Sequence, residues 1–257
     1  MLKINHSYGF FSCCSVRLHR IIQWVNNNKK LPSVVDSSKQ YSWYKIKAGD
    51  VTFDYFEHYN KVKNSVPLKN IDYKDSYQYI DYRKLDYDSI VPYVTKYFTP
   101  SKEIKSIVQF IENKYNLDYD NICVLFYRGN DKNTETQICD YNEYIDKATK
   151  IKEENPSIKF LLQSDETEFI STMLDSFSTD SFYFKDEIRT INKQMSTVDK
   201  VLKESNNEFS KKYLAITIIM SKCKYVVCGS GNCSIWIMFY RGNANGVYQN
   251  LDNVWLE

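Results

Sequence analysis

The sequence predicts an α/β protein with a parallel sheet in its second half. Strand-like runs occur there over 122–127, 160–163 and 225–228, and a polar turn and a helical pattern follow each of them. This alternation is typical of parallel strands that are joined by crossover helices. With 257 residues, of which 43% are hydrophobic, the chain is long enough for one large domain or two small ones.

The N-terminal segment predicts a turn, a helix and a strand in succession. Apolar residues over 16–25 recur at helical spacing, which indicates a helix with Ser12 or Ser15 as its cap. After a polar break, residues 31–36 have the pattern of a short buried strand that is entered through a proline. Residues 37 to about 93 are rich in Tyr, Asp and Lys, so we expect irregular structure and short helices that pack through aromatic side chains.

A well-marked helix is expected directly after Pro100. Ser101 suits the N-cap position, and the apolar residues over 104–111 lie on one helical face. The pattern ends near Asn116. Further helices are expected after the strands, over 140–154, 166–177 and 213–221 and from about Cys233 onward.

The charge pattern excludes some classes of partner. The 34 Lys and Arg residues are mixed with 32 Asp and Glu residues, which gives a net charge of +2 and no basic block for nucleic acid. No apolar run approaches the ~18 residues of a membrane span, and the first residues lack the layout of a secretory signal. We therefore expect a soluble, cytoplasmic protein without a membrane span.

The cysteines predict buried thiols rather than disulfides or a metal site. There are seven, an odd number, and Cys13 and Cys14 are adjacent, which argues against a disulfide framework. Cys223, Cys228 and Cys233 recur at equal spacing, but zinc sites use closer ligand pairs and no histidine lies nearby in sequence. We expect no bound metal.

Polar turns follow the three predicted strands of the second half, over 128–132, 164–166 and 229–232. In a parallel sheet the ligand lies beyond the carboxyl ends of the strands, so these turns are the candidate site. Two of them contain glycine, which is scarce here, with seven residues in the whole chain.

The composition of these turns favours an anionic ligand. Gly229 and Gly231 flank Ser230 between a strand and a helix, where backbone N–H groups can approach an anion. The alternative is a tight turn that needs glycine for its backbone angles. Arg128 adds a fixed cation that binds phosphate oxygens in a bidentate manner. Together they predict a phosphorylated ligand.

Four blocks of the chain follow a known order of motifs. They are FYRGNDKNTE (126–135), FLLQSDETEF (160–169), CKYVVCGSGNCSIWIMFYRGNANG (223–246), and GFFSCCSVRLHRIIQW with LPSVVD and Asp54-Tyr55-Phe56 at the N-terminal end. The first resembles a His-x-Arg-Gly-Thr-Asp-Lys-x-x-Glu motif. The set covers nearly the whole chain and resembles the fucosyltransferase superfamily that includes the α1,6-, protein O- and nodulation fucosyltransferases.

This resemblance implies a GT-B-like architecture in a compact version, in which two Rossmann-like halves face a cleft. Residues 1–118 would form the acceptor-side half and 119–257 the nucleotide-sugar-binding half. The implied reaction is an inverting, metal-independent transfer of fucose from GDP-fucose, with no cofactor. The implied partners are the nucleotide sugar and a glycan or glycoprotein whose hydroxyl accepts the sugar.

The resemblance also assigns roles at the donor site. Arg128 would bind the donor pyrophosphate, where a guanidinium stabilises the charge of departing GDP; a surface salt bridge at the sheet end is the alternative. Asp165 would hydrogen-bond the guanine ring, and a helix N-cap is its alternative, or additional, role. The other implied donor-binding residues are Ser230, Gly231, Asn232, Gly9 and Phe10.

Inversion requires a base that takes the acceptor proton. The family's acid corresponds most naturally to Glu135, although one branch has an extra residue here and the register stays open. Lys132 would support this acid or the leaving phosphate, and Asp131 would hold the loop through hydrogen bonds. A solvated charge run is the alternative for Lys132 and Glu135.

Two positions depart from the family pattern. Phe126 replaces the usual histidine, which helps to bind the nucleotide, and Gly129 replaces a second arginine of some branches. Phenylalanine can stack on a ring but cannot form a hydrogen bond to it. A different GDP-sugar donor, or a degenerate member that binds without catalysing, therefore stays open.

Other function classes fit less well. Another nucleotide-sugar transferase of this architecture is the strongest alternative, because guanine contacts are few. A serine hydrolase would need Gly-x-Ser-x-Gly around Ser230, and a dinucleotide oxidoreductase would need Gly-x-Gly-x-x-Gly after the first strand; both are missing. The acceptor is not predicted, since the Tyr-rich stretch over 37–93 carries no known motif.

Overall fold

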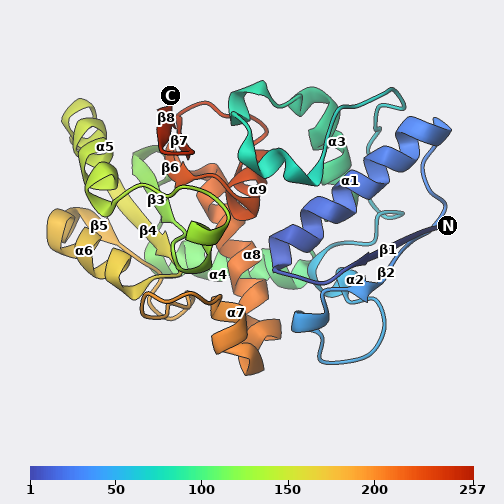
Figure 1. Ribbon diagram of the computed structural model, residues 1–257, viewed down its shortest axis with the longest axis horizontal. Coiled ribbons are helices and arrows are strands. Elements are labelled where there is room, and N and C mark those ends of the chain that lie inside the picture. Colours follow the sequence, from blue (N-terminus) through green and yellow to red (C-terminus); the bar gives the residue numbers. More distant parts are fainter.

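A six-stranded sheet lies at the centre of the second half of the chain (Figure 1). The computed structural model describes residues 1–257, apart from the side chain of Asn133. The strand order is β5-β4-β3-β6-β7-β8, and only the β7–β8 pair is antiparallel. The strands are β3 (Ile122–Tyr127), β4 (Lys159–Ser164), β5 (Ser181–Phe182), β6 (Tyr225–Gly229), β7 (Val247–Leu251) and β8 (Val254–Leu256).

Both faces of this sheet are covered by helices. Along β3, Cys123, Leu125 and Tyr127 face α5 (Tyr141–Glu154) and α6 (Thr167–Phe177) in one apolar core. Val124 and Phe126 belong to a second core, which includes residues of α4 (Lys102–Tyr115), α8 (Asn206–Lys222) and α9 (Asn232–Arg241). A strand buried on both faces reads as a continuous apolar run, which is why β3 is evident in the sequence.

The second half confirms the predicted parallel α/β pattern. Ser101 caps α4 by accepting a hydrogen bond from the N–H of Ile104 at 3.4 Å, and Asn116 ends this helix in the left-handed conformation. Helix α8 begins at Asn206, seven residues before its predicted start, because its first turns are polar. Strands β5 and β8 lie at the edges of the sheet, and β7 is a short strand with two polar residues; none of the three was predicted.

The first half contains one β–α–β unit, formed by β1 (Leu2–His6), α1 (Phe10–Asn28) and β2 (Val35–Gln40). Its two strands are parallel and form a sheet of their own, beside α1 in Figure 1. The predicted strand over 31–36 was wrong in its bounds, because β2 begins only at Val35, where Leu2 of β1 is its first partner. Strand β1 itself was not predicted.

The predicted caps of α1 were also wrong. The helix begins at Phe10, Gly9 is its N-cap residue, and no side chain caps it. The two candidate serines lie inside the helix and have other partners. Ser12 bonds to the His6 ring at 2.9 Å, and Ser15 accepts a hydrogen bond from the indole N–H of Trp236 at 3.0 Å.

The segment after β2 is irregular and aromatic, as predicted. The ring of Phe10 packs against Tyr41, Tyr44 and Tyr55, with centroid distances of 5.6, 5.6 and 4.8 Å. Its short elements are η1 (Ser42–Tyr44), α2 (Thr52–Tyr55), η2 (Asp75–Tyr79) and η3 (Tyr82–Lys84), followed by α3 (Tyr87–Phe98). The remaining short elements are η4 (Tyr119–Asn121), η5 (Asn130–Thr134), η6 (Ser178–Asp180), α7 (Val198–Val201) and η7 (Lys203–Ser205).

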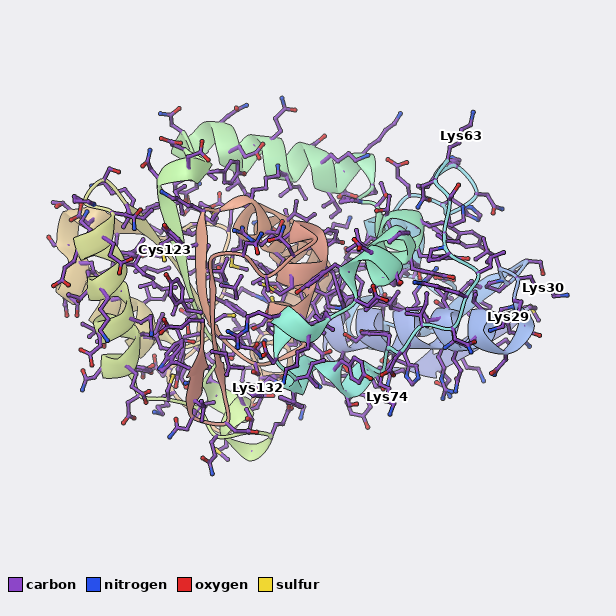
Figure 2. The ribbon with its side chains drawn as sticks, turned by 90° about the horizontal axis from the view of Figure 1, so that it is seen from above. Lys29, Lys30, Lys63, Lys74, Cys123 and Lys132 are labelled. Carbon is purple, nitrogen blue, oxygen red and sulfur yellow. The ribbon has the colours of Figure 1, made fainter. Side chains whose placement is uncertain are left out.

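One apolar core connects the two parts of the chain. Phe11 of α1 contacts the rings of Tyr213 and Trp236 at 5.2 and 6.2 Å. The division at 118/119 therefore separates two sheets but not two cores. In Figure 2, Cys123 lies in the large sheet, and Lys29 and Lys30 mark the opposite end of the molecule, at the end of α1.

The seven cysteines are all buried and free, as predicted for structural thiols. Burial raises the pKa of the Cys228 thiol to about 12, which keeps it protonated at neutral pH. Among the described helices, none has the length and apolar character to cross a membrane.

The Ser15–Trp236 hydrogen bond should be a measurable part of the stability. Ser15→Ala leaves the buried indole N–H without an acceptor, so we expect the free energy of unfolding to fall by about 1–3 kcal/mol. Urea denaturation measures this loss. Ser106→Ala, at an exposed position of α4, is the matched control, and equal effects of the two variants would contradict the assignment.

Candidate functional site

A cavity of about 550 Å³ opens at the carboxyl ends of β3, β4 and β6. Residues from both parts of the chain line it, from the turn before α1 to the start of α9. All nine residues that the sequence singles out are among them: Gly9, Phe10, Arg128, Lys132, Glu135, Asp165, Ser230, Gly231 and Asn232. Parallel strand ends collect at one edge of a sheet, which explains why turns far apart in sequence meet here.

Arg128 is held in the cavity by a carboxylate. Its Nε donates to Asp165 Oδ2 at 2.8 Å, and its Nη1 donates to the Tyr213 hydroxyl at 3.3 Å. Burial alone lowers the pKa of Arg128, but the charge of Asp165 and smaller interactions with Tyr213 and Asp131 together outweigh burial and keep the pKa above its ordinary value. A guanidinium has more N–H donors than these contacts use, so donors remain for an anion.

Asp165 is a positioning residue in this arrangement. Its Oδ2 accepts from Arg128, and its Oδ1 accepts from the backbone N–H of Gly129 at 3.1 Å. The N-cap alternative was wrong, because α6 begins at Thr167, after Glu166, and has no side-chain cap. The assignment of Asp165 to guanine stays a prediction, and a base would have to share the carboxylate with two donors already present.

Gly129 is needed because the buried carboxylate of Glu166 fills the space beside it. A Cβ at position 129 would lie 2.0 Å from Glu166 Oε1. Glu166 in turn accepts hydrogen bonds from the N–H of Asn130, at 2.6 Å, and from the Tyr141 hydroxyl. The second arginine of some fucosyltransferase branches therefore has no room here.

The turn before α9 is fixed by residues that the sequence analysis missed. Ser230 Oγ donates to the carbonyl of Asn250 at 2.9 Å and accepts from Gln249 at 2.8 Å. The N–H of Gly231 donates to the Tyr82 hydroxyl at 3.0 Å. These contacts hold the turn, and both Tyr82 and Gln249 lie in segments without a motif.

The donors left for an anion are in the first turn of α9. The first N–H groups of a helix have no acceptor within the helix, so those of Asn232, Cys233 and Ser234 point out of its N-terminus. The helix dipole adds partial positive charge at the same place. Asn232 Oδ1, which is an acceptor and not a donor, is buried without a partner among the described residues.

Lys132 and Glu135 form an ion pair at the cavity. The Tyr79 hydroxyl donates to the same oxygen, Glu135 Oε2, at 2.6 Å. Partial burial alone would raise the pKa of Glu135, but hydrogen bonds from Lys132 and Tyr79 hold the pKa below its ordinary value. Glu135 is therefore a carboxylate at neutral pH, and Tyr79 is a further residue without a signal in the sequence.

Phe126, the penultimate residue of β3, also lines the cavity. It is paired in register with Gln163 of β4, so the two side chains lie on the same face of the sheet. Gln163 is 5% exposed, and its Oε1 is buried without a partner in the described part of the chain. The sequence analysis did not select Gln163; a polar residue at the end of an apolar strand was its only signal.

The N-terminal wall is formed by the turn at the start of α1. No atom lies within 4 Å of a Cβ built at Gly9, so the space beside this residue is open. The Phe10 side chain is buried in the aromatic cluster described above, and its contacts are those of packing. Within the described residues, no cluster of His, Cys, Asp and Glu has a geometry that could hold a metal ion.

Comparison with known proteins finds similarity in structure but not in sequence. No protein-family profile matches the chain, and no curated protein sequence matches it. A solved structure of the NodZ α1,6-fucosyltransferase soaked with GDP-fucose matches with a TM-score of 0.59 at 8% identity, over 100% of this chain and 98% of that one.

The chain therefore has a fucosyltransferase-like fold. The Bradyrhizobium fucosyltransferase NodZ matches with a TM-score of 0.54 at 8% identity, over 92% of this chain and 91% of that one. A NodZ structure co-crystallised with GDP gives 0.53 at 9% identity, over 92% and 90%. These matches confirm the predicted GT-B-like fold class, and at such low identity they establish the fold alone.

The contact of Gly129 with Glu166 predicts a specific sensitivity. Gly129→Ala forces the buried carboxylate aside, so we expect a loss of about 1–3 kcal/mol in the free energy of unfolding, as for other overpacked sites. Gly9→Ala, whose new methyl group enters open space, should cost less. Thermal and urea unfolding of the two variants provide the comparison, and a Gly129→Ala protein as stable as the wild type would contradict the observed geometry.

Proposed function

We propose that this protein is a glycosyltransferase that uses GDP-fucose as donor and transfers fucose, with inversion, to a hydroxyl of a glycan or glycoprotein. The observation that carries the proposal is Arg128, a guanidinium held by Asp165 in a cavity that also receives the N-terminus of α9. Proteins of the same fold were solved after soaking with GDP-fucose and in co-crystals with GDP, which supports the choice of donor.

The diphosphate of the donor would lie between Arg128 and the first turn of α9. When the bond between the sugar anomeric carbon and the phosphate oxygen breaks, negative charge accumulates on GDP. The free N–H donors of Arg128 and of the helix N-terminus are fixed before the reaction, so they stabilise this charge without reorganisation. Lys132 adds a second cation beside the turn, since a Cβ at Gly231 would lie 3.7 Å from its Cε.

Glu135 is the proposed base. The acceptor oxygen attacks the anomeric carbon from the face opposite GDP, and its proton passes to the carboxylate. Lys132 and Tyr79 keep this carboxylate ionised and orient it, but they also occupy Oε2. Proton transfer to this oxygen therefore requires one of these donors to move.

The acceptor would enter past Tyr8 and Trp43, which line the cavity from the N-terminal side. The two rings lie 6.4 Å apart, and Tyr8 is 61% exposed. Exposed aromatic faces at a cavity rim suit the apolar faces of sugar rings. We therefore expect Tyr8→Ala to lower transfer to a glycan and to leave GDP-fucose hydrolysis unchanged.

A nucleotide-binding protein without turnover is the second candidate. Two observations favour it: Phe126 offers no hydrogen bond to a base, and Glu135 is tied by two donors. This candidate predicts GDP binding without hydrolysis or transfer. A transferase that uses another GDP-sugar would instead turn over a different donor.

Calorimetry with GDP, GDP-fucose, GDP-mannose, UDP and UDP-glucose tests the proposal, with hydrolysis of each sugar donor followed in parallel. We expect guanine nucleotides to bind and Arg128→Lys to weaken GDP binding about 10-fold or more, because lysine keeps the charge but loses the fork geometry. Arg20→Lys, on the exposed side of α1, is the matched control. A wild-type protein that binds none of the nucleotides would contradict the proposal.

The ion pair predicts the acid limb of the pH–rate profile. Because the pKa of Glu135 is lowered, its carboxylate form persists as pH falls, and activity declines only below the ordinary glutamate pKa of about 4.3. Lys132→Met removes one cause of the lowering, so the decline should begin at a higher pH. Lys61→Met, at an exposed position, should leave the profile unchanged. An identical acid limb in wild type and Lys132→Met would exclude Glu135 as the titrating base.

A further inference from the structure

Gln163 is a buried amide that lacks a hydrogen-bond partner for its Oε1 in the described structure. A buried polar group without a partner costs about 1–3 kcal/mol, and native proteins rarely leave one without a reason. Gln163 lines the cavity, so a rotation of its carboxamide toward the cavity would let a bound molecule supply the missing partner. The position is therefore a candidate contact for a ligand rather than a packing defect.

The place of Gln163 in the sheet indicates which part of a ligand it meets. Arg128 and Asp165 each lie two residues beyond the paired residues Phe126 and Gln163. Two residues of strand correspond to a rise of about 6.6 Å. A nucleoside diphosphate whose phosphates bind at Arg128 can thus reach Phe126 and Gln163 with its base.

Among the neighbouring side chains, Gln163 has hydrogen-bonding groups that are free to contact the edge of a base. Asp165, the expected contact for guanine, already accepts hydrogen bonds with both of its oxygens. Phe126 offers only an aromatic face, on which a base can stack. The Gln163 carboxamide carries both an acceptor and a donor.

We propose that Gln163 recognises the base of the nucleotide and that it selects a lactam edge such as that of guanine. Its oxygen accepts from the ring N1–H, and its nitrogen donates to the adjacent O6, while Phe126 packs against the base plane. This inference rests on the proposed function, because it requires a nucleoside diphosphate in the cavity. It assigns base selectivity to Gln163, and it leaves Asp165 with the positioning of Arg128.

Two other amides in the cavity share this feature, and one of them, Gln78, serves as the control. The side-chain oxygens of Gln78 and Asn232 are also buried without a partner among the described residues. Asn232 belongs to the first turn of α9, and Gln78 lies in η2, next to Tyr79, which bonds Glu135. Neither lies on the β3–β4 face with Phe126, so neither should influence the choice of base.

Calorimetry of wild type, Gln163→Met and Gln78→Met with GDP, N1-methyl-GDP and inorganic pyrophosphate tests the inference. Methionine preserves the volume of glutamine, and a thermal unfolding curve for each variant checks its fold. We expect the wild type and Gln78→Met to prefer GDP over N1-methyl-GDP. Gln163→Met should lose this preference and bind GDP about 10-fold more weakly or worse, with its pyrophosphate affinity unchanged.

The outcomes separate the inference from the proposed function. If Gln163→Met retains the preference for GDP, or loses pyrophosphate affinity to the same extent as GDP affinity, the inference is overturned while the nucleotide site stands. If GDP does not bind to the wild type at all, the proposed function fails and the inference fails with it.

If Gln163→Met does not fold, Gln163→Glu replaces it. The glutamate keeps the acceptor oxygen but loses the N–H donor to O6. We therefore expect Gln163→Glu to retain the preference for GDP over N1-methyl-GDP but to bind GDP more weakly than the wild type. GDP binding equal to that of the wild type would overturn the inference.

Discussion

The contact between Arg128 and Asp165 is the interaction on which the site depends. It joins the turns after β3 and β4, and Asp165 also holds the backbone of Gly129, so one carboxylate sets both the cation and the turn that carries it. Asp165 is buried and Arg128 is partly exposed, so removing Arg128 is costly because it leaves the buried carboxylate uncompensated. A cation that is held in this way cannot reorganise when an anion arrives, and this rigidity is what a site for a charged leaving group requires.

The first half of the chain completes the cavity from the other side. Tyr82 holds the turn before α9 through the N–H of Gly231, and Tyr79 holds Glu135. Ser15 of α1 accepts from Trp236 of α9, which couples the two parts of the chain through a buried hydrogen bond between helices. The geometry of the site is thus a property of the whole chain, although the residues that face an anion come from the C-terminal sheet.

The sequence predicts the architecture best where an element is buried on both faces or is fixed by residues close to it in sequence. The strand β3 is buried on both faces and α4 has a serine cap, and both are evident from the residues alone. Strand β1 and the register of β2 are not, because a two-stranded parallel pair depends on a partner distant in sequence. The caps of α1 were mispredicted because the helix begins before Ser12 and Ser15, and Ser15 instead bonds to a residue more than two hundred positions away.

The site shows the same division. The residues that the motifs select all lie in one cavity, yet their partners could not be predicted, because Tyr79, Tyr82 and Gln249 come from segments with no pattern of their own. Gln163 escaped notice because a glutamine at the end of an apolar strand becomes informative only when its missing partner is visible. The sequence predicts which strand ends lie together. The structure is needed to show which polar groups at these ends already have hydrogen-bond partners.

The most direct test of the central claim is a crystal structure of the protein with GDP. The account predicts the diphosphate within hydrogen-bonding distance of the Arg128 guanidinium and of the first N–H groups of α9, with Asp165 still bonded to Arg128. A diphosphate bound away from Arg128, or a rearrangement in which Asp165 leaves Arg128 to contact the base, would contradict it.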